Sequence, residues 1–133
     1  MSALTNDAEN LLLAWLLTTG AATRPTAWAV RLHTGDPGET GAANEVLVAS
    51  DSNYAAPIAV TMGSPASGSS ASTTQVVHTP SVAAGTYSVT HASIWSTAPG
   101  AVALFKGALA TPRSISNTSP LTFEIGEIIA ALD

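Results

Sequence analysis

Three histidines are the residues of this chain best suited to acid–base chemistry or metal binding. His33, His78 and His91 are widely spaced, and no two have the His-x-x-x-His spacing that places both ligands on one helix face. The chain contains no cysteine, so it offers neither a thiolate ligand nor a thiol nucleophile. We interpret the histidines as hydrogen-bonded or surface residues and predict no metal site; zinc held by histidines from distant strands is the alternative.

Four carboxylates fall close together in the sequence, at Asp36, Glu39, Glu45 and Asp51. Calcium prefers several carboxylate oxygens, but this spacing does not match an EF-hand loop. We predict a solvated acidic loop, with a structural calcium ion in the 36–51 region as the alternative.

Glycines at every third position, Gly35, Gly38 and Gly41, suggest a phosphate-binding loop at first sight. Such a loop opens a helix and needs amides or cations to receive the anion. Here Asp36 and Glu39 lie between the glycines and no helical pattern follows, which favours a turn-rich connection.

Nucleophilic chemistry has no recognisable motif either. Serine is abundant, but neither a Gly-x-Ser-x-Gly elbow nor a Ser-x-x-Lys motif occurs. Aromatic residues, which form sugar platforms in glycoside hydrolases, make up only 5% of the chain. We therefore predict no catalytic residue and no cofactor, and we expect that the protein is not an enzyme.

Charge is scarce, because only 10% of the residues are charged although 46% are hydrophobic, against ~25% charged in typical soluble domains. A soluble monomer normally keeps a charged surface, so we expect other subunits to cover part of this one. The net charge is −5, and the four cations are too scattered for the basic stripe that nucleic acid requires. We predict no direct contact with nucleic acid.

The longest apolar run, Leu11 to Leu17, is far shorter than the ~20 residues that span a bilayer. It follows acidic residues, whereas a signal peptide begins with a basic segment. We expect a chain that is made in the cytoplasm, is not exported and does not contact a membrane.

The elements that must position these residues begin with one helix, predicted over residues 4–20. Asn6 suits the N-cap, Glu9 can complete a capping box, and Gly20 suits a left-handed position after the helix. One wide apolar stripe predicts packing against a large apolar surface; its members are Leu4, Ala8, Leu11, Leu12, Trp15 and Leu16.

From Trp28 onward the apolar period changes to two, which indicates strands. We predict a single domain over residues 1–133 that is mainly β, with an antiparallel β-sandwich or barrel-like fold over residues 27–133. The expected strands lie at 28–33, 45–49, 54–62, 73–79, 86–95, 102–109, 113–116 and 121–132, with a flexible surface loop or an edge crossing at 63–72.

Candidate interface residues follow from this arrangement. Tryptophan is enriched at subunit contacts, and the helix stripe needs an apolar partner. The candidates are Leu4, Leu11, Trp15, Trp28 and Trp95.

Several segments, in order and spacing, resemble small virion structural proteins of tailed bacteriophages, a group that includes tail-fibre-like and capsid-decorating proteins. The segments are LTNDAENLLL at residues 4–13, LHTGDPG at 32–38, NEV at 44–46, THASIW at 90–95, LFKGAL at 104–109 and TPR at 111–113.

The resemblance implies a non-enzymatic virion component, made in the host cytoplasm, that associates with itself as a homotrimer and with other virion proteins. Our leading hypothesis is a capsid decoration or cement protein that clamps neighbouring major capsid subunits. The alternatives are a tail-tip or tail-fibre module and, more remotely, a carbohydrate-binding β-sandwich.

Overall fold

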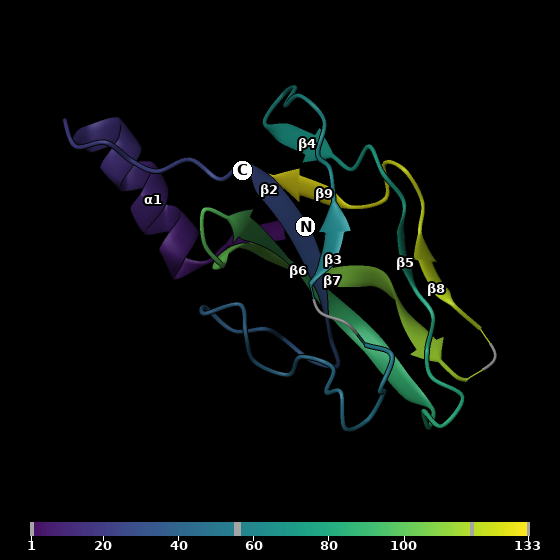
Figure 1. Cartoon of the computed structure of the whole chain (residues 1–133). Coiled ribbons are helices and arrows are strands. Elements are labelled where there is room, and N and C mark those ends of the chain that lie inside the picture. Colours follow the sequence, from purple (N-terminus) through teal and green to yellow (C-terminus); the bar gives the residue numbers. More distant parts are fainter. Residues whose placement is uncertain (1, 55–56, 118, 133) are drawn as a thin grey trace.

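The computed structural model describes residues 2–54, 57–117 and 119–132 (Figure 1). This part of the chain is mainly β, with antiparallel sheets and a single helix near the N-terminus, which confirms the predicted fold class. The elements are β1 (Ser2–Leu4), α1 (Asn6–Leu17), β2 (Ala27–His33), β3 (Ile58–Val60), β4 (Ser69–Ala71), β5 (Val76–His78), β6 (Tyr87–Ala98), β7 (Val102–Ile115), β8 (Leu121–Phe123) and β9 (Ile129–Ala131).

A five-stranded sheet with the order β1-β7-β6-β2-β3 forms the centre of the fold. Val30 of β2 lies opposite Ile94 of β6, which in turn lies opposite Phe105 of β7, so the three side chains share one face. That face is apolar because the strands alternate between buried apolar residues and residues of the other face.

Two small sheets, β4 with β9 and β5 with β8, lie over this apolar face (Figure 1). The resulting core draws on both layers; its fully buried members include Val30, Leu32, Val76, Val89 and Ile115, together with Leu121 and Phe123 of β8.

The opposite face of the central sheet is covered by the segment from residue 34 to residue 46. The Thr34 N–H donates to Asn44 O and the Val46 N–H donates to Leu32 O, so the segment leaves β2 and returns to it. At Gly41 the backbone φ is +71°, and a Cβ atom there would lie 2.7 Å from the Cβ of Ala103 in β7. Gly41 is therefore required by the close approach of this segment to the sheet.

The helix is shorter than predicted at both ends. Leu4 belongs to β1, and the N-cap is Thr5 rather than Asn6, because the Thr5 hydroxyl accepts from the Ala8 N–H and donates to the carbonyl of Ala103. The helix ends at Leu17, where the Thr18 N–H donates to the carbonyl of Ala14 and closes the last turn. Gly20 does not have a left-handed backbone conformation. Within the described part of the chain, no helix has the length and apolar content needed to cross a bilayer.

Several strand predictions also need correction. Residues 45–49 do not form a strand: Glu45 makes only an isolated antiparallel bridge to His33, and a turn begins at residue 48. The expected loop at 63–72 contains β4, which pairs with β9. Residues 102–109 and 113–115 belong to one long strand, β7, whose pairing with β6 shifts register between Val89 and His91. The segment 121–132 divides into β8 and β9 because Gly126, at φ +84°, turns the chain between them.

Candidate functional site

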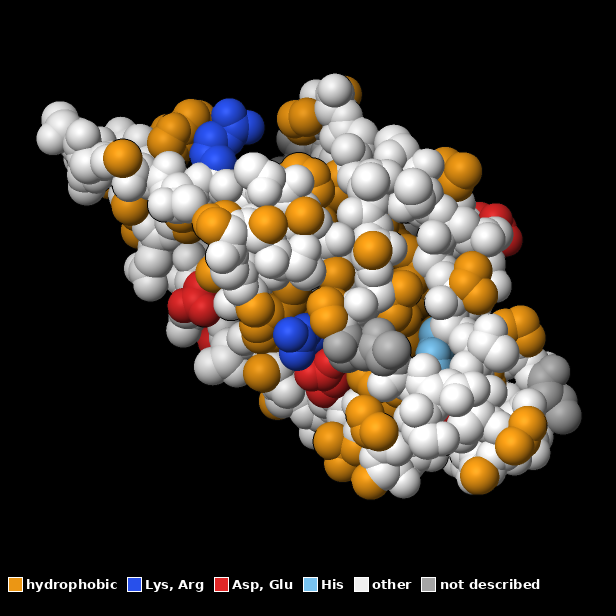
Figure 2. All heavy atoms as spheres, in the orientation of Figure 1, with side chains coloured by type: hydrophobic (Ala, Val, Ile, Leu, Met, Phe, Trp, Pro, Cys, Tyr) orange, Lys and Arg blue, Asp and Glu red, His pale blue; other side chains and the backbone are white. Residues whose placement is uncertain are grey.

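The second half of α1 projects beyond the sheet and is left uncovered by the described chain (Figure 1). At its base the helix packs on β7 and β1, and Ala8 is the residue that becomes buried there. Further along, four large apolar side chains are exposed: Leu13 (53%), Trp15 (60%), Leu16 (66%) and Leu17 (76%). Figure 2 shows one face of the molecule, on which hydrophobic side chains are spread with few charged groups between them.

This projecting half is apolar on every side. Each residue from Leu11 to Leu17 is apolar, so no polar stripe remains that could face water. A helix that is apolar all round is normally found inside a larger protein assembly or a membrane. This segment is therefore a candidate contact surface.

The predicted interface residues occupy three places. Leu4, half-buried opposite Phe105, and Leu11, half-buried on α1, precede the exposed Trp15 along the N-terminal arm. Trp28 packs against the core, whereas Trp95 lies on the opposite face of the central sheet. The structure thus brings three of the five candidates to the α1 end of the molecule and separates the other two.

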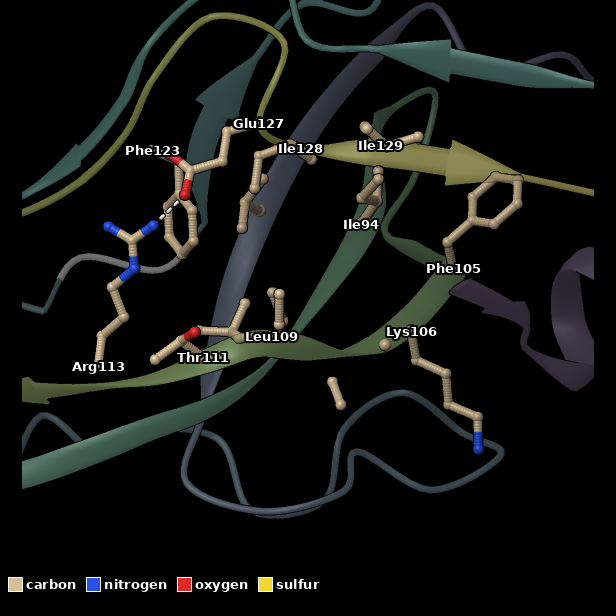
Figure 3. A pocket seen from close by; sticks show the side chains of 15 residues that line it. Ile94, Phe105, Lys106, Leu109, Thr111, Arg113, Phe123, Glu127, Ile128 and Ile129 are labelled. Carbon is tan, nitrogen blue, oxygen red and sulfur yellow. Dashed lines mark hydrogen bonds and ion pairs between the residues drawn. The ribbon is translucent and has the colours of Figure 1, made fainter. Parts of the chain in front are cut away.

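An apolar groove of about 420 Å³ lies between β7 and the turn that leads into β9 (Figure 3). Its floor is buried and apolar, and its rim includes the exposed Ile129; the apolar lining consists of Val30, Ile94, Phe105, Leu109, Phe123, Ile128 and Ile129. Arg113 at one end forms an ion pair with Glu127 and stacks over the ring of Phe123, 5.2 Å from its centroid.

Sequence reasoning missed this groove. The signal that could have indicated it is the interrupted pattern between residues 109 and 113, which by itself predicts two separate strands. In the structure these residues belong to β7 at the point where its register against β6 shifts. An irregularity of this kind moves side chains away from regular sheet geometry.

A buried polar chain connects β2 and β6 on the sheet face opposite the core. Trp95 Nε1 donates to the Ser93 hydroxyl at 2.8 Å, and Ser93 lies 2.7 Å from His33 Nε2. The other ring nitrogen, His33 Nδ1, lies 2.8 Å from the carbonyl of Ala43, which only accepts. Nδ1 therefore carries the proton, and Nε2 accepts from Ser93.

This His33–Ser93 pair has the spacing of a nucleophile and its base, but it lacks access to a substrate. Ser93 is 1% exposed and His33 is fully buried. Burial lowers the pKa of His33, although the Ala43 carbonyl opposes the shift. A buried neutral histidine held between a carbonyl and a hydroxyl fixes the covering segment to the sheet.

A second buried network surrounds Asp51, which corrects the prediction of a solvated acidic loop. The Asp51 side chain is fully buried and accepts from the Ser81 N–H at 2.9 Å, from Tyr87 at 2.8 Å and from His78 Nε2 at 2.8 Å. Burial alone would raise the pKa of Asp51, but these hydrogen bonds and one from the Asn53 N–H lower it to about 2.

The other three carboxylates face different partners. Lys106 Nζ lies 2.5 Å from Glu39 and 3.7 Å from Asp36. Glu45 pairs with Arg31 at 3.1 Å and accepts from the Tyr54 hydroxyl, whose pKa is raised mainly by burial. Among the residues that the structure places, no three histidine, aspartate or glutamate side chains are grouped to hold a metal ion.

The family model described as Podophage GP4 fiber I protein gp80 matches residues 3–131 of the chain. The chain belongs to this family of phage fibre proteins. The match confirms the resemblance to small virion structural proteins of tailed phages, with the tail-fibre-like members as the relevant ones. No match was found among curated proteins.

A member of this fibre family is a structural component of a phage virion. The candidate sites in such a protein are accordingly its exposed apolar surfaces. The two buried networks, at His33 and Asp51, join segments of one chain and stay inside it. The uncovered half of α1 and the groove beside β7 are two apolar surfaces of the described chain.

Proposed function

We propose that this protein is a non-catalytic, homotrimeric subunit of a tail fibre, and that it works by packing the projecting half of α1 against neighbouring virion subunits. The observation that carries this proposal is the uncovered apolar helix on a chain whose residues 3–131 match a fibre family. Burying such a surface on association is favourable because it removes apolar area from water. The scarcity of charge elsewhere supports assembly with other subunits.

Capsid decoration, in which the protein would clamp major capsid subunits, is the second candidate, supported by the same low charge. Copy number separates the two roles. In purified virions, a fibre subunit should be present in far fewer copies than the major capsid protein, and antibody-linked gold should label the tail. A quantity comparable with the major capsid protein, and label over the head, would replace the fibre role with the decoration role.

The proposed trimer is tested separately, by light scattering on the purified protein. The expected mass is that of three chains; a mass of one chain at every concentration would contradict the trimer. A carbohydrate-binding role has less support, because Trp15, the exposed tryptophan, lies among leucines on the helix and not on a sheet beside other exposed rings.

A further inference from the structure

We propose that the projecting half of α1 of one copy packs into the groove between β7 and β9 of the next copy. The neighbouring chain would thus complete each groove. This inference rests on the proposed assembly function and specifies its partner as a second copy of this chain, bound through its residues 11–17.

The helix supplies the apolar surface for this contact. The exposed fractions of Leu13, Trp15, Leu16 and Leu17 correspond to roughly 400–500 Å² of side-chain surface, comparable with the largest apolar patch on a typical monomer. A specific interface needs about 800 Å² per partner. The helix would therefore supply at most about half of such an interface, and contacts beside residues 11–17 would have to supply the rest.

The groove supplies the complementary surface. Its floor, with Ile94 and Ile128, is apolar, and its volume of about 420 Å³ is in the range of pockets that enclose small ligands. Laying an apolar helix face into an apolar groove is a recurrent mode of recognition.

The charges around the groove favour an uncharged occupant. Arg113 is paired with Glu127, and its guanidinium also donates to the carbonyl of Thr122 at 3.0 Å. Lys106 at the other end is paired with Glu39 and Asp36. Residues 11–17 carry no charge, so their binding leaves no new buried ion without a partner.

A chain cannot place its own helix in its own groove. Leu4 pairs with Phe105, which lines one end of the groove, and the Thr5 N–H donates to the Leu104 carbonyl. The helix starts at that end and runs away from the sheet (Figures 1 and 3). The contact is therefore made between copies and joins two different surfaces. A chain of such head-to-tail contacts closes into a ring, such as the proposed trimer, when the rotation between copies allows it.

Cross-linking tests the contact directly, because the chain has no cysteine of its own. Leu16→Cys and Ile129→Cys are placed in separate chains, which are co-expressed with different tags and treated with a short bismaleimide. We expect a cross-linked pair that carries both tags, and no such product when Leu16→Cys is combined with Val82→Cys, an 86% exposed position outside the groove lining. Cross-linking of Leu16→Cys chains to one another would show helices bundled together and overturn the proposal, as would the absence of any cross-link.

A charge placed on the groove rim gives a second test. In the Ile129→Glu variant the groove-side cysteine is placed at Thr111, and its cross-link to Leu16→Cys should disappear. Association of the chains should also weaken at least tenfold. Ile125→Glu, at a 68% exposed site outside the groove lining, is the matched control and should leave association unchanged. Equal association in both variants would overturn the proposal. The location of the protein in the virion is an independent measurement, so a protein found on the head could still show this contact.

Discussion

Ala8 and Trp15 lie on the same side of α1, two helical turns apart, yet Ala8 is 4% exposed and Trp15 is 60% exposed. Ala8 packs at the base of the helix, whereas Trp15 lies beyond the edge of the sheet. The apolar face that attaches the helix to its own domain therefore continues past that domain. This continuity makes the helix an extension of the core that another subunit can cover.

Removing the exposed apolar side chains from α1 should separate association from folding. The double variant Trp15→Ser, Leu16→Ser should lose the oligomer, while the free energy of unfolding of the monomer changes by no more than about 1 kcal/mol, because both sites are exposed. Light scattering and urea denaturation measure the two effects. Val82→Ser, at the most exposed large apolar side chain outside the helix, should leave both unchanged.

Gly41→Ala should destabilise the fold by about 2–4 kcal/mol. The left-handed φ of +71° disfavours a side chain, and the added Cβ would meet Ala103 at 2.7 Å. Gly85→Ala is the matched control, since nothing lies within 4 Å of its Cβ position and its φ is not left-handed. The thermal unfolding midpoints of the two variants are compared. Equal midpoints would contradict the close approach of residues 34–46 to Ala103 in β7.

Ser93→Ala should cost about 2 kcal/mol of stability, because it leaves His33 Nε2 and Trp95 Nε1 without their shared buried partner. Ser114→Ala, at an exposed serine on β7, should cost little. Chemical denaturation measures both. Ser93 should also resist labelling by a fluorophosphonate, and stoichiometric labelling of Ser93 would indicate a nucleophile in place of a structural hydroxyl.

The sequence was sufficient for the fold class but not for details that depend on distant partners. Asn is locally the better N-cap, so the sequence favours Asn6. Thr5 is used because its hydroxyl also donates to the carbonyl of Ala103, 98 residues away. The helix and the alternating strands, in contrast, follow from periodicity, which is a local property.

The same limit applies to the candidate site. The sequence around Asp51 predicts an exposed loop carboxylate, because the hydrogen-bond partners that bury it are far away in the sequence. These partners, His78, Ser81 and Tyr87, are 27, 30 and 36 residues away. The apolar run of α1 could be predicted from sequence. Its exposure could not, because it depends on where the sheet ends relative to the helix in the assembled fold. The groove, likewise, requires β7 and β9 to be placed together before it exists.

Asp51→Asn should be strongly destabilising at neutral pH. The carboxylate is fully buried and accepts four hydrogen bonds, two on each oxygen. In asparagine an NH2 group replaces one of these oxygens, so two groups that donate to Asp51 would face another donor. The expected loss is about 2–4 kcal/mol, measured by urea denaturation at pH 7. Asp36→Asn, at an exposed carboxylate, should have a much smaller effect, and equal losses would contradict the role assigned to Asp51.

The pH dependence of stability should carry the signature of the same residue. The folded pKa of Asp51 is lowered to about 2, against about 3.9 in an unfolded chain, so the unfolded chain takes up this proton first as the pH falls. The stabilisation, about 2–3 kcal/mol, is fully present above about pH 5 and is lost as the pH falls to about 2. His33, whose pKa is lowered by burial, adds an earlier loss that begins near its unfolded pKa of about 6.5 and continues below it. The difference in unfolding free energy between the native protein and Asp51→Asn should therefore be constant from pH 7 to 5 and should shrink between pH 5 and 2; a difference that stays constant down to pH 2 would show that Asp51 titrates normally in the folded protein.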